Sequence, residues 1–350
     1  MPHLRDRDAI VTEEGLIFRV YGYWHPSEGY VCDPEYAPST LYRSANPRAV
    51  RQSREGVYYK FFEHDGLNFI EENFPKYRVY CKPLHKSLVG VKEADIGRVR
   101  LPVERLTELL DAAQPKDSLV KKAEKVVSAV LERTSLKASD LGVFGSLLHS
   151  FHHPDYSDLD FVVVGAKAQL ELREALADFY REGSLLANEF DRKVAGKTWR
   201  FQNFTFDEYV THQRRKGIYG VLLGSDGERD VKVEFEPVRG YDEVVNEYLT
   251  EMEVSPLGLV SAEVKVLDDA EAFYMPSIYP VEVERVIRGP EAAGVERIVS
   301  YVEEFRGQVF TDELARVQGM LEQVTTPSRS YKQITLTYGP YYYAQVLARL

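Results

Sequence analysis

Hydrophobic residues in the middle of the chain follow two periods, which predict helices and strands in alternation. Apolar side chains recur at helical spacing over residues 118–131 and again over 166–183. Between these segments, the apolar runs 141–144 and 159–164 have the length of buried strands. Three further strand-like runs follow, at 198–204, 217–223 and 230–237. Residues 116–250 therefore predict a helix, a strand, a helical turn, a second strand, a second helix and then strands.

The flanking segments have different patterns, and we place domain boundaries on either side of the central region. Residues 1–115 contain short strand-like runs and one helical segment at 65–73, which predict a small α+β module. Its segment 23–45 is rich in Pro, Tyr, Gly and Ser and is expected to be a loop. Residues 251–350 contain short alternating runs at regular spacing, which predict a small antiparallel β-barrel, with the OB type as one candidate, and a short helix at the end.

The composition is typical of a globular protein and bears on the cellular compartment in which we expect it. The 350 residues are 44% hydrophobic and 28% charged, and no apolar run approaches the about 20 residues that span a bilayer. The first residues show no secretion signal, and two distant cysteines, Cys32 and Cys81, make neither a disulfide framework nor a zinc site. We therefore expect a cytoplasmic protein without membrane contact. The net charge of −11 argues against broad binding to nucleic-acid backbone, but leaves room for a local basic groove.

The candidate chemistry centres on two aspartates that open the second central strand. Asp158 and Asp160 are two residues apart, so on a strand their carboxylates project from one face. Carboxylates this close repel each other, and an oxygen-only set of ligands suits Mg²⁺ or Mn²⁺. The preceding strand ends in Gly145 and Ser146. Gly145 allows close approach of a ligand to the backbone, and Ser146 can donate a hydrogen bond to a phosphate oxygen.

A third carboxylate is available on a later strand. The run 230–237 alternates in such a way that Lys232, Glu234 and Glu236 share one face. Either acid could bind a metal ion and help to deprotonate an attacking hydroxyl. A solvated strand face is the competing interpretation for these charged residues.

This combination resembles the DNA polymerase β-type nucleotidyltransferase superfamily, and within it the archaeal minimal nucleotidyltransferases and CCA-adding enzymes. The motif is Gly145-Ser146, then eleven residues, then Asp158-Leu-Asp160, and later Val233-Glu234-Phe235-Glu236-Pro237. The resemblance implies a mixed sheet flanked by helices, with two Mg²⁺ ions held by Asp158, Asp160 and Glu234. It implies that Gly145 and Ser146 hold the nucleoside triphosphate. Glu234 takes the place of the third acid, and Glu236 is its competitor.

The resemblance covers about 120 residues, and two departures from the family bear on function. The stretch after Ser146, residues 147–151, lacks the small basic and Gly-Thr cluster of CCA-adding enzymes, and the third acid is Glu rather than Asp. Two functions follow as hypotheses. One is Mg²⁺-dependent transfer of a nucleoside monophosphate from an NTP to an acceptor hydroxyl, with RNA as the first acceptor considered. The other is a catalytically inactive protein of the same fold that binds nucleotide or RNA.

Basic and aromatic residues outside the motif are candidates for contact with nucleic acid. One group lies in the N-terminal module, with solvated loops as the competing interpretation: Arg43, Arg48, Arg51 and Arg54, with Tyr42, Tyr58 and Tyr59 nearby. A second group follows the central helix: one of its members is a candidate for contact with triphosphate or acceptor, and a solvated loop is the favoured interpretation for each residue taken singly. It comprises Arg192, Lys193, Lys197, Arg200, Arg214, Arg215 and Lys216. For Tyr341, Tyr342 and Tyr343, packing is favoured over base stacking.

Overall fold

A computed structural model describes residues 3–113, 115–191, 199–224, 228–339 and 341–350. Contacts divide the chain into two compact units. The first comprises residues 1–81, 86–187 and 220–245, and the second residues 82–85, 188–219 and 246–350. The division into domains at 115/116 and 250/251 stays a prediction. Among the described residues, every helix is too short or too polar to cross a membrane.

The N-terminal part of the first unit is built on one sheet. Its strand order is β4 (Val50–Ser53), β5 (Gly56–Lys60), β3 (Gly29–Pro38), β2 (Ile17–Val20), β1 (Ala9–Val11), β8 (Arg98–Arg100), with β7 (Lys86–Lys92) beside β3 and β6 (Arg78–Cys81) beside β7. Helix α1 (Asp65–Asn73) has the predicted bounds. The loop predicted for 23–45 is wrong, because β3 occupies ten of its residues and pairs with β2, β5 and β7.

The central region forms a second sheet, in the order β11 (Leu186–Asn188), β12 (Tyr219–Leu222), β13 (Val231–Val238), β10 (Leu159–Val164), β9 (Leu141–Val143). β10 is parallel to β13 and antiparallel to β9, so the sheet is mixed. The predicted helices are confirmed as α3 (Ser118–Arg133) and α5 (Ala166–Glu182), and α2 (Pro102–Asp111) precedes them. The strand expected at 198–204 is wrong for residues 199–204, which are irregular; residue 198 lies outside the described range.

The two faces of this second sheet pack against different parts of the chain. Leu159, Phe161 and Val163 of β10 join the apolar faces of the helices, in a core that also holds residues of α2, α3 and α5. Val162, on the opposite face, belongs to another cluster, whose members include residues from β1, β2, β3 and β5. Alternation along the strand therefore directs Asp160 to the face that the N-terminal sheet covers. Helices α2, α3 and α5 therefore cover one face of this sheet, and the N-terminal sheet packs on the other.

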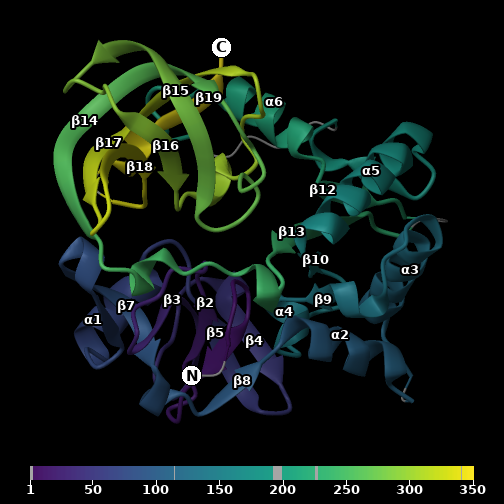
Figure 1. Ribbon diagram of the computed structural model, residues 1–350. Coiled ribbons are helices and arrows are strands. Elements are labelled where there is room, and N and C mark those ends of the chain that lie inside the picture. The colour runs from purple at the N-terminus through teal and green to yellow at the C-terminus, as the bar shows by residue number, and fades with distance from the viewer. Residues whose placement is uncertain (1–2, 114, 192–198, 225–227, 340) are drawn as a thin grey trace. The chain divides into compact units, whose positions relative to one another are not determined.

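The second unit contains a closed five-stranded barrel (Figure 1). Its order is β14 (Glu253–Val266), β15 (Ser277–Arg288), β16 (Val295–Ser300), β18 (Ser330–Leu336), β17 (Leu314–Thr325), and β17 pairs with β14 to close it. The predicted barrel is confirmed, but it is not wholly antiparallel, because β16 and β18 run parallel. The helix expected at the end of the chain is wrong: β19 (Val346–Arg349) is a strand paired with β17.

Helix α6 (Phe206–Lys216) belongs to the barrel unit and is held by backbone carbonyls. Lys216 Nζ donates to Glu304 O over 2.8 Å, and His212 Nδ1 lies 3.1 Å from Gln308 O. Phe204 and Ile218, on either side of the helix, are part of the barrel core. The helix is therefore fixed to the barrel by both polar and apolar contacts.

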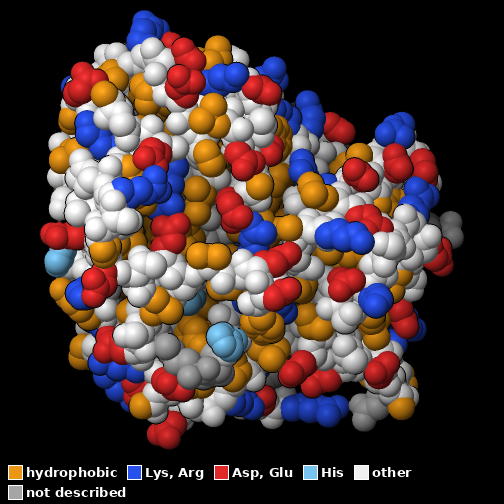
Figure 2. Space-filling view, viewed as in Figure 1, with side chains coloured by type: hydrophobic (Ala, Val, Ile, Leu, Met, Phe, Trp, Pro, Cys, Tyr) orange, Lys and Arg blue, Asp and Glu red, His pale blue; other side chains and the backbone are white. Residues whose placement is uncertain are grey.

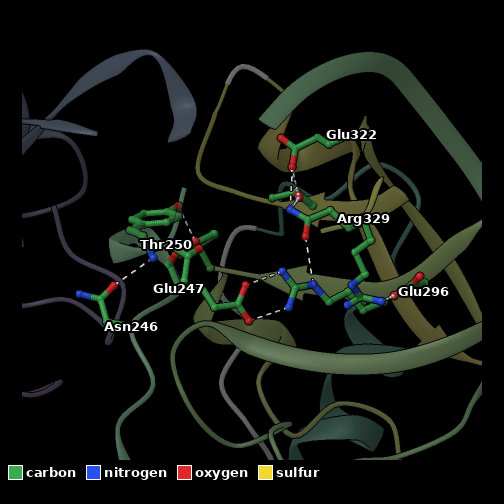
Figure 3. A network of polar contacts seen from close by, with 11 residues as sticks. Asn246, Glu247, Thr250, Glu296, Glu322 and Arg329 are labelled. Atoms are coloured by element: carbon green, nitrogen blue, oxygen red, sulfur yellow. Dashed lines mark hydrogen bonds and ion pairs between the residues drawn. The ribbon is translucent and has the colours of Figure 1, made fainter. Parts of the chain in front are cut away.

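A polar network ties the segment before β14 to the barrel (Figure 3). Glu247 accepts two hydrogen bonds from the guanidinium of Arg297 on β16, at 2.8 and 2.7 Å. Arg297 Nε also donates to Gln333 Oε1 of β18 over 3.1 Å, and Gln333 donates to Glu322 of β17 over 3.0 Å. A bidentate pair of this kind fixes geometry as well as charge, so it holds the segment in register on three strands.

Candidate active site

The structure brings the predicted carboxylates to adjacent strands of the second sheet. Asp160 on β10 is directly paired with Glu234 on the parallel strand β13. Asp158 immediately precedes β10 and is exposed, whereas Asp160 and Glu234 are partly exposed. Side chains at paired positions of neighbouring strands lie on the same face. Two strands far apart in sequence therefore place Asp160 and Glu234 side by side on one sheet face, with Asp158 directly before β10.

The electrostatics of Asp160 reflect this proximity. Burial, the charge of Glu234 and the charge of Asp158 together raise the pKa of Asp160 to about 8, although Lys60 and Lys232 oppose the shift. Partial desolvation of its carboxyl also raises the pKa of Asp158, against the opposing charge of Lys232. Negative charge thus accumulates here beyond what the neighbouring cations neutralise. A divalent cation is the usual means of relieving such repulsion.

The structure separates the two candidates for the third acid. Glu236 is only 3% exposed and forms a buried ion pair with Arg7, with 3.2 Å between Arg7 Nη2 and Glu236 Oε2. Glu234 is the acid paired with Asp160, and its carboxylate forms an ion pair with Lys232 on the same strand. Glu234 is therefore the better candidate for the third acid beside Asp160, and Glu236 is engaged in a buried ion pair.

The fit of a metal ion depends on Glu234. Oxygen donors from Asp158, Asp160 and Glu234 suit Mg²⁺ or Mn²⁺. Within the described ranges, no three His, Cys, Asp or Glu side chains are grouped as metal ligands in the arrangement observed. Binding by all three residues would require the Glu234 carboxylate to turn from Lys232 toward the aspartates.

Gly145 and Ser146 lie against the same carboxylates. Gly145 begins α4 (Gly145–Leu148) with a φ of +59°, and a Cβ at this residue would lie 2.6 Å from Asp160 Oδ2. The backbone N–H of Phe144 donates to Asp160 O over 3.0 Å, and this hydrogen bond joins the end of β9 to the start of β10. Ser146 is partly exposed, and its hydroxyl has no hydrogen-bond partner among the residues that the structure describes. The glycine is therefore required by contact with Asp160 as well as by its own conformation.

The loop between α4 and Asp158 is held by residues that the motif did not reveal. Arg229 donates to the carbonyls of Pro154 and Ser157, directly before Asp158. Arg105 donates to Leu147 O over 3.2 Å and to Ser150 Oγ over 2.9 Å. Arginines that satisfy loop carbonyls restrict the positions the loop can adopt. The motif gives no sign of these contacts, because Arg105 lies far from it in the chain and Arg229, which is four residues before Val233, is not one of its residues.

The three histidines of this loop have structural partners. His149 is buried, with its Nδ1 3.0 Å from Arg100 Nη1 and its Nε2 3.5 Å from a Glu35 carboxylate oxygen. His152 Nε2 lies 2.9 Å from Asp117 Oδ2, and Asp117 caps the N-terminus of α3. The ring of His153 packs against Tyr156, with 4.6 Å between centroids. These contacts anchor the loop to α3 and to the N-terminal sheet.

The other predicted basic and aromatic groups are largely engaged within the protein. Arg215 pairs with Glu313, and Arg214 donates to Phe190 O over 2.8 Å. Arg200 Nη1 donates to the Tyr343 hydroxyl over 3.2 Å. Tyr342 packs against Phe201, with 5.0 Å between centroids. Arg192, Lys193 and Lys197 lie outside the described residues.

Comparisons with known proteins give one relative for the whole chain. The protein named "Uncharacterized protein MJ1086" of Methanocaldococcus jannaschii is 28% identical over 338 residues, which cover 95% of each chain. No protein-family model matches the chain, and no solved structure matches it. The similarity extends across the N-terminal sheet, the central sheet and the barrel, so this chain is similar over its whole organisation to an uncharacterized archaeal protein.

Proposed function

We propose that the protein is a nucleotidyltransferase that moves a nucleoside monophosphate from a nucleoside triphosphate to an acceptor hydroxyl. The observation that carries the proposal is the direct pairing of Asp160 with Glu234 on parallel strands, with Asp158 beside them and Gly145 against Asp160. Phosphoryl-type transfer depends mainly on positioning and on neutralising charge, which is what clustered carboxylates with a divalent ion provide.

Each residue has a role in the proposed reaction. Asp158 and Asp160 would hold Mg²⁺ or Mn²⁺, and Glu234 would complete the ligand set and accept the proton of the acceptor hydroxyl. When bound, the divalent ions neutralise phosphate charge. The acceptor oxygen forms a bond to the α-phosphorus, the bond between that phosphorus and the bridging oxygen to the β-phosphate breaks, and pyrophosphate leaves. Ser146, with its free hydroxyl, is placed to donate to a phosphate oxygen.

RNA is proposed as the acceptor because of the architecture of the second unit. The strand order and the parallel β16–β18 pair describe a Greek-key barrel, a class that includes the oligonucleotide-binding OB-fold. On the face shown in Figure 2, basic and acidic side chains are interspersed and no large area is of one sign. Binding of RNA to this face would therefore depend on individual side chains more than on a broad basic field.

A second candidate function is binding of nucleotide or RNA without catalysis. The observation that favours it is the ion pair between Glu234 and Lys232, because a third acid neutralised by a lysine is not poised to accept a proton. The two candidates differ in whether labelled nucleotide reaches an acceptor.

Calorimetry followed by a transfer assay tests both candidates. We expect the wild type to bind an NTP only when Mg²⁺ is present, and Asp160→Asn to lose that binding at least tenfold. The matched control, Asp178→Asn, removes an exposed carboxylate of α5 and should bind as the wild type does. Labelled NTP, Mg²⁺ and an RNA pool then show transfer. Binding without transfer supports the second candidate, and absence of Mg²⁺-dependent binding rejects the nucleotidyltransferase.

A further inference from the structure

The N-terminal sheet contributes a face that lies over the carboxylates. Tyr36 of β3 pairs directly with Lys60 of β5, and Arg51 of β4 pairs with Tyr58 of β5. Directly paired residues share a face, and residues two apart on a strand do so as well. Tyr36, Arg51, Tyr58 and Lys60 therefore project from one face of this sheet.

That face packs on the segment which follows Gly145 and Ser146. The ring centroid of Tyr36 lies 5.1 Å from that of Phe151 and 5.3 Å from that of His149. The ring centroid of Tyr58 lies 4.9 Å from that of Phe151. Tyr36 and Tyr58 also share a buried cluster with Val162, which is two residues beyond Asp160 and on the same side of β10. The face that carries Lys60 is thus fixed against the carboxylate-bearing face of the central sheet.

Lys60 differs from the other cations near the site because its ammonium is not engaged. Lys232 is paired with Glu234, Arg229 is bound to loop carbonyls, and Arg51 Nη1 donates to Arg48 O and Val50 O at 2.6 and 2.9 Å. Lys60 is partly exposed, and its ammonium makes no hydrogen bond or ion pair with the residues described by the structure. Its charge nevertheless acts on both Asp158 and Asp160.

We propose that Lys60 binds a phosphate group of the nucleoside triphosphate, so that the N-terminal sheet completes the substrate side of the site. The inference rests on the proposed function and identifies a ligand group that the central motif lacks. An ammonium with three donors and no partner suits a phosphate oxygen, and such charge-assisted hydrogen bonds are among the stronger ones. A lysine beside carboxylates also lowers the repulsion that an incoming triphosphate meets.

Three variants of the full chain test this inference by calorimetry in the presence of Mg²⁺. Lys60→Met keeps the aliphatic part of the side chain and removes the charge, so we expect about tenfold weaker NTP binding. Lys60→Arg keeps the charge and should recover most of the affinity. The control Lys86→Met removes an exposed lysine from β7 and should bind as the wild type does.

A series of ligands separates phosphate contact from a general effect on the site. The loss caused by Lys60→Met should be largest with the triphosphate and absent with the unphosphorylated nucleoside, and the thermal unfolding midpoint should stay within a few degrees of the wild type. A wild type that binds NTP with Mg²⁺, together with a Lys60→Met variant within twofold of it, overturns this inference alone. Absence of binding by the wild type overturns the proposed function and this inference together.

Discussion

Gly145 has a backbone conformation that favours glycine, and it also lies in direct contact with Asp160 of the candidate site. Its φ of +59° favours glycine, and the space for a Cβ is taken by the Asp160 carboxylate at 2.6 Å. Gly183, at the C-terminus of α5, has nearly the same φ of +61°, but no atom lies within 4 Å of the place for its Cβ. Both glycines therefore adopt a left-handed backbone conformation, but only Gly145 lies against another side chain, that of Asp160.

We expect Gly145→Ala and Gly183→Ala each to lower the free energy of unfolding by about 1 kcal/mol, because alanine is strained in the left-handed region. Only Gly145→Ala should also displace Asp160, and we expect about tenfold weaker Mg²⁺-dependent NTP binding from it. Urea unfolding measures the first effect and calorimetry the second. Equal nucleotide affinity in both variants would show that the contact with Asp160 is not needed for binding.

At the scale of secondary-structure elements, a buried ion pair joins the N-terminal segment to β13. Arg7 and Glu236 are 2% and 3% exposed, and the ring of Phe144, the residue before Gly145, lies 5.3 Å from the Arg7 guanidinium carbon. The pair thus connects the start of the chain with β13 and with the strand end that leads into the candidate site. Removing one partner of such a pair leaves a buried charge with less compensation.

We expect Arg7→Met to destabilise the protein by about 3 kcal/mol, because the buried Glu236 carboxylate loses its ion pair with Arg7. The double variant Arg7→Met/Glu236→Met should recover part of this loss, because it removes both charges of the pair and keeps side-chain volume, while Asp6 still loses its contact with Arg7. A double-mutant cycle from urea unfolding measures the coupling. If the two single losses simply add in the double variant, the ion pair does not hold these elements together.

The elements also show which helices and strands a sequence pattern predicts correctly. Helices α1, α3 and α5 agree with their predicted ranges, because an amphipathic period over several turns has few alternative explanations. β3 was missed because Pro34 and Pro38 lie within it, and proline in a run normally argues against a strand. β19 was predicted as a helix because a short apolar run has no clear period, and its pairing with β17 decided the matter.

The dependence of stability on pH is a property of the whole molecule to which Asp160 contributes. Its pKa is about 8 in the folded protein, against 3.8 for an ordinary aspartate. The folded state therefore keeps a proton that the unfolded chain releases. This contribution to stability is present below about pH 4 and is lost as the pH rises to about 8. Asp8, whose pKa burial raises to about 7, acts in the same direction.

Asp160→Asn removes the ionisation of Asp160 and leaves that of Asp8. We expect the metal-free variant to exceed the wild type in free energy of unfolding by on the order of 3 kcal/mol at pH 8, and by only about 1 kcal/mol or less near pH 4.5. Urea unfolding in the presence of a chelator, at both pH values, measures the difference. A gap that is the same at pH 4.5 and pH 8 would mean that the carboxyl is not held protonated by the fold.

The sequence by itself determined the local parts of this protein: the helices, most strands, the barrel-forming region, and the spacing that sets Asp158 directly before β10 and Asp160 on it. These follow from periods of 3.6 and 2 residues, which depend only on neighbours in the chain. The tertiary structure alone decided that Glu234 faces Asp160 while Glu236 pairs with Arg7, and that the N-terminal sheet brings Lys60 to the same face. The physical reason is that strand register and sheet packing join residues far apart in sequence.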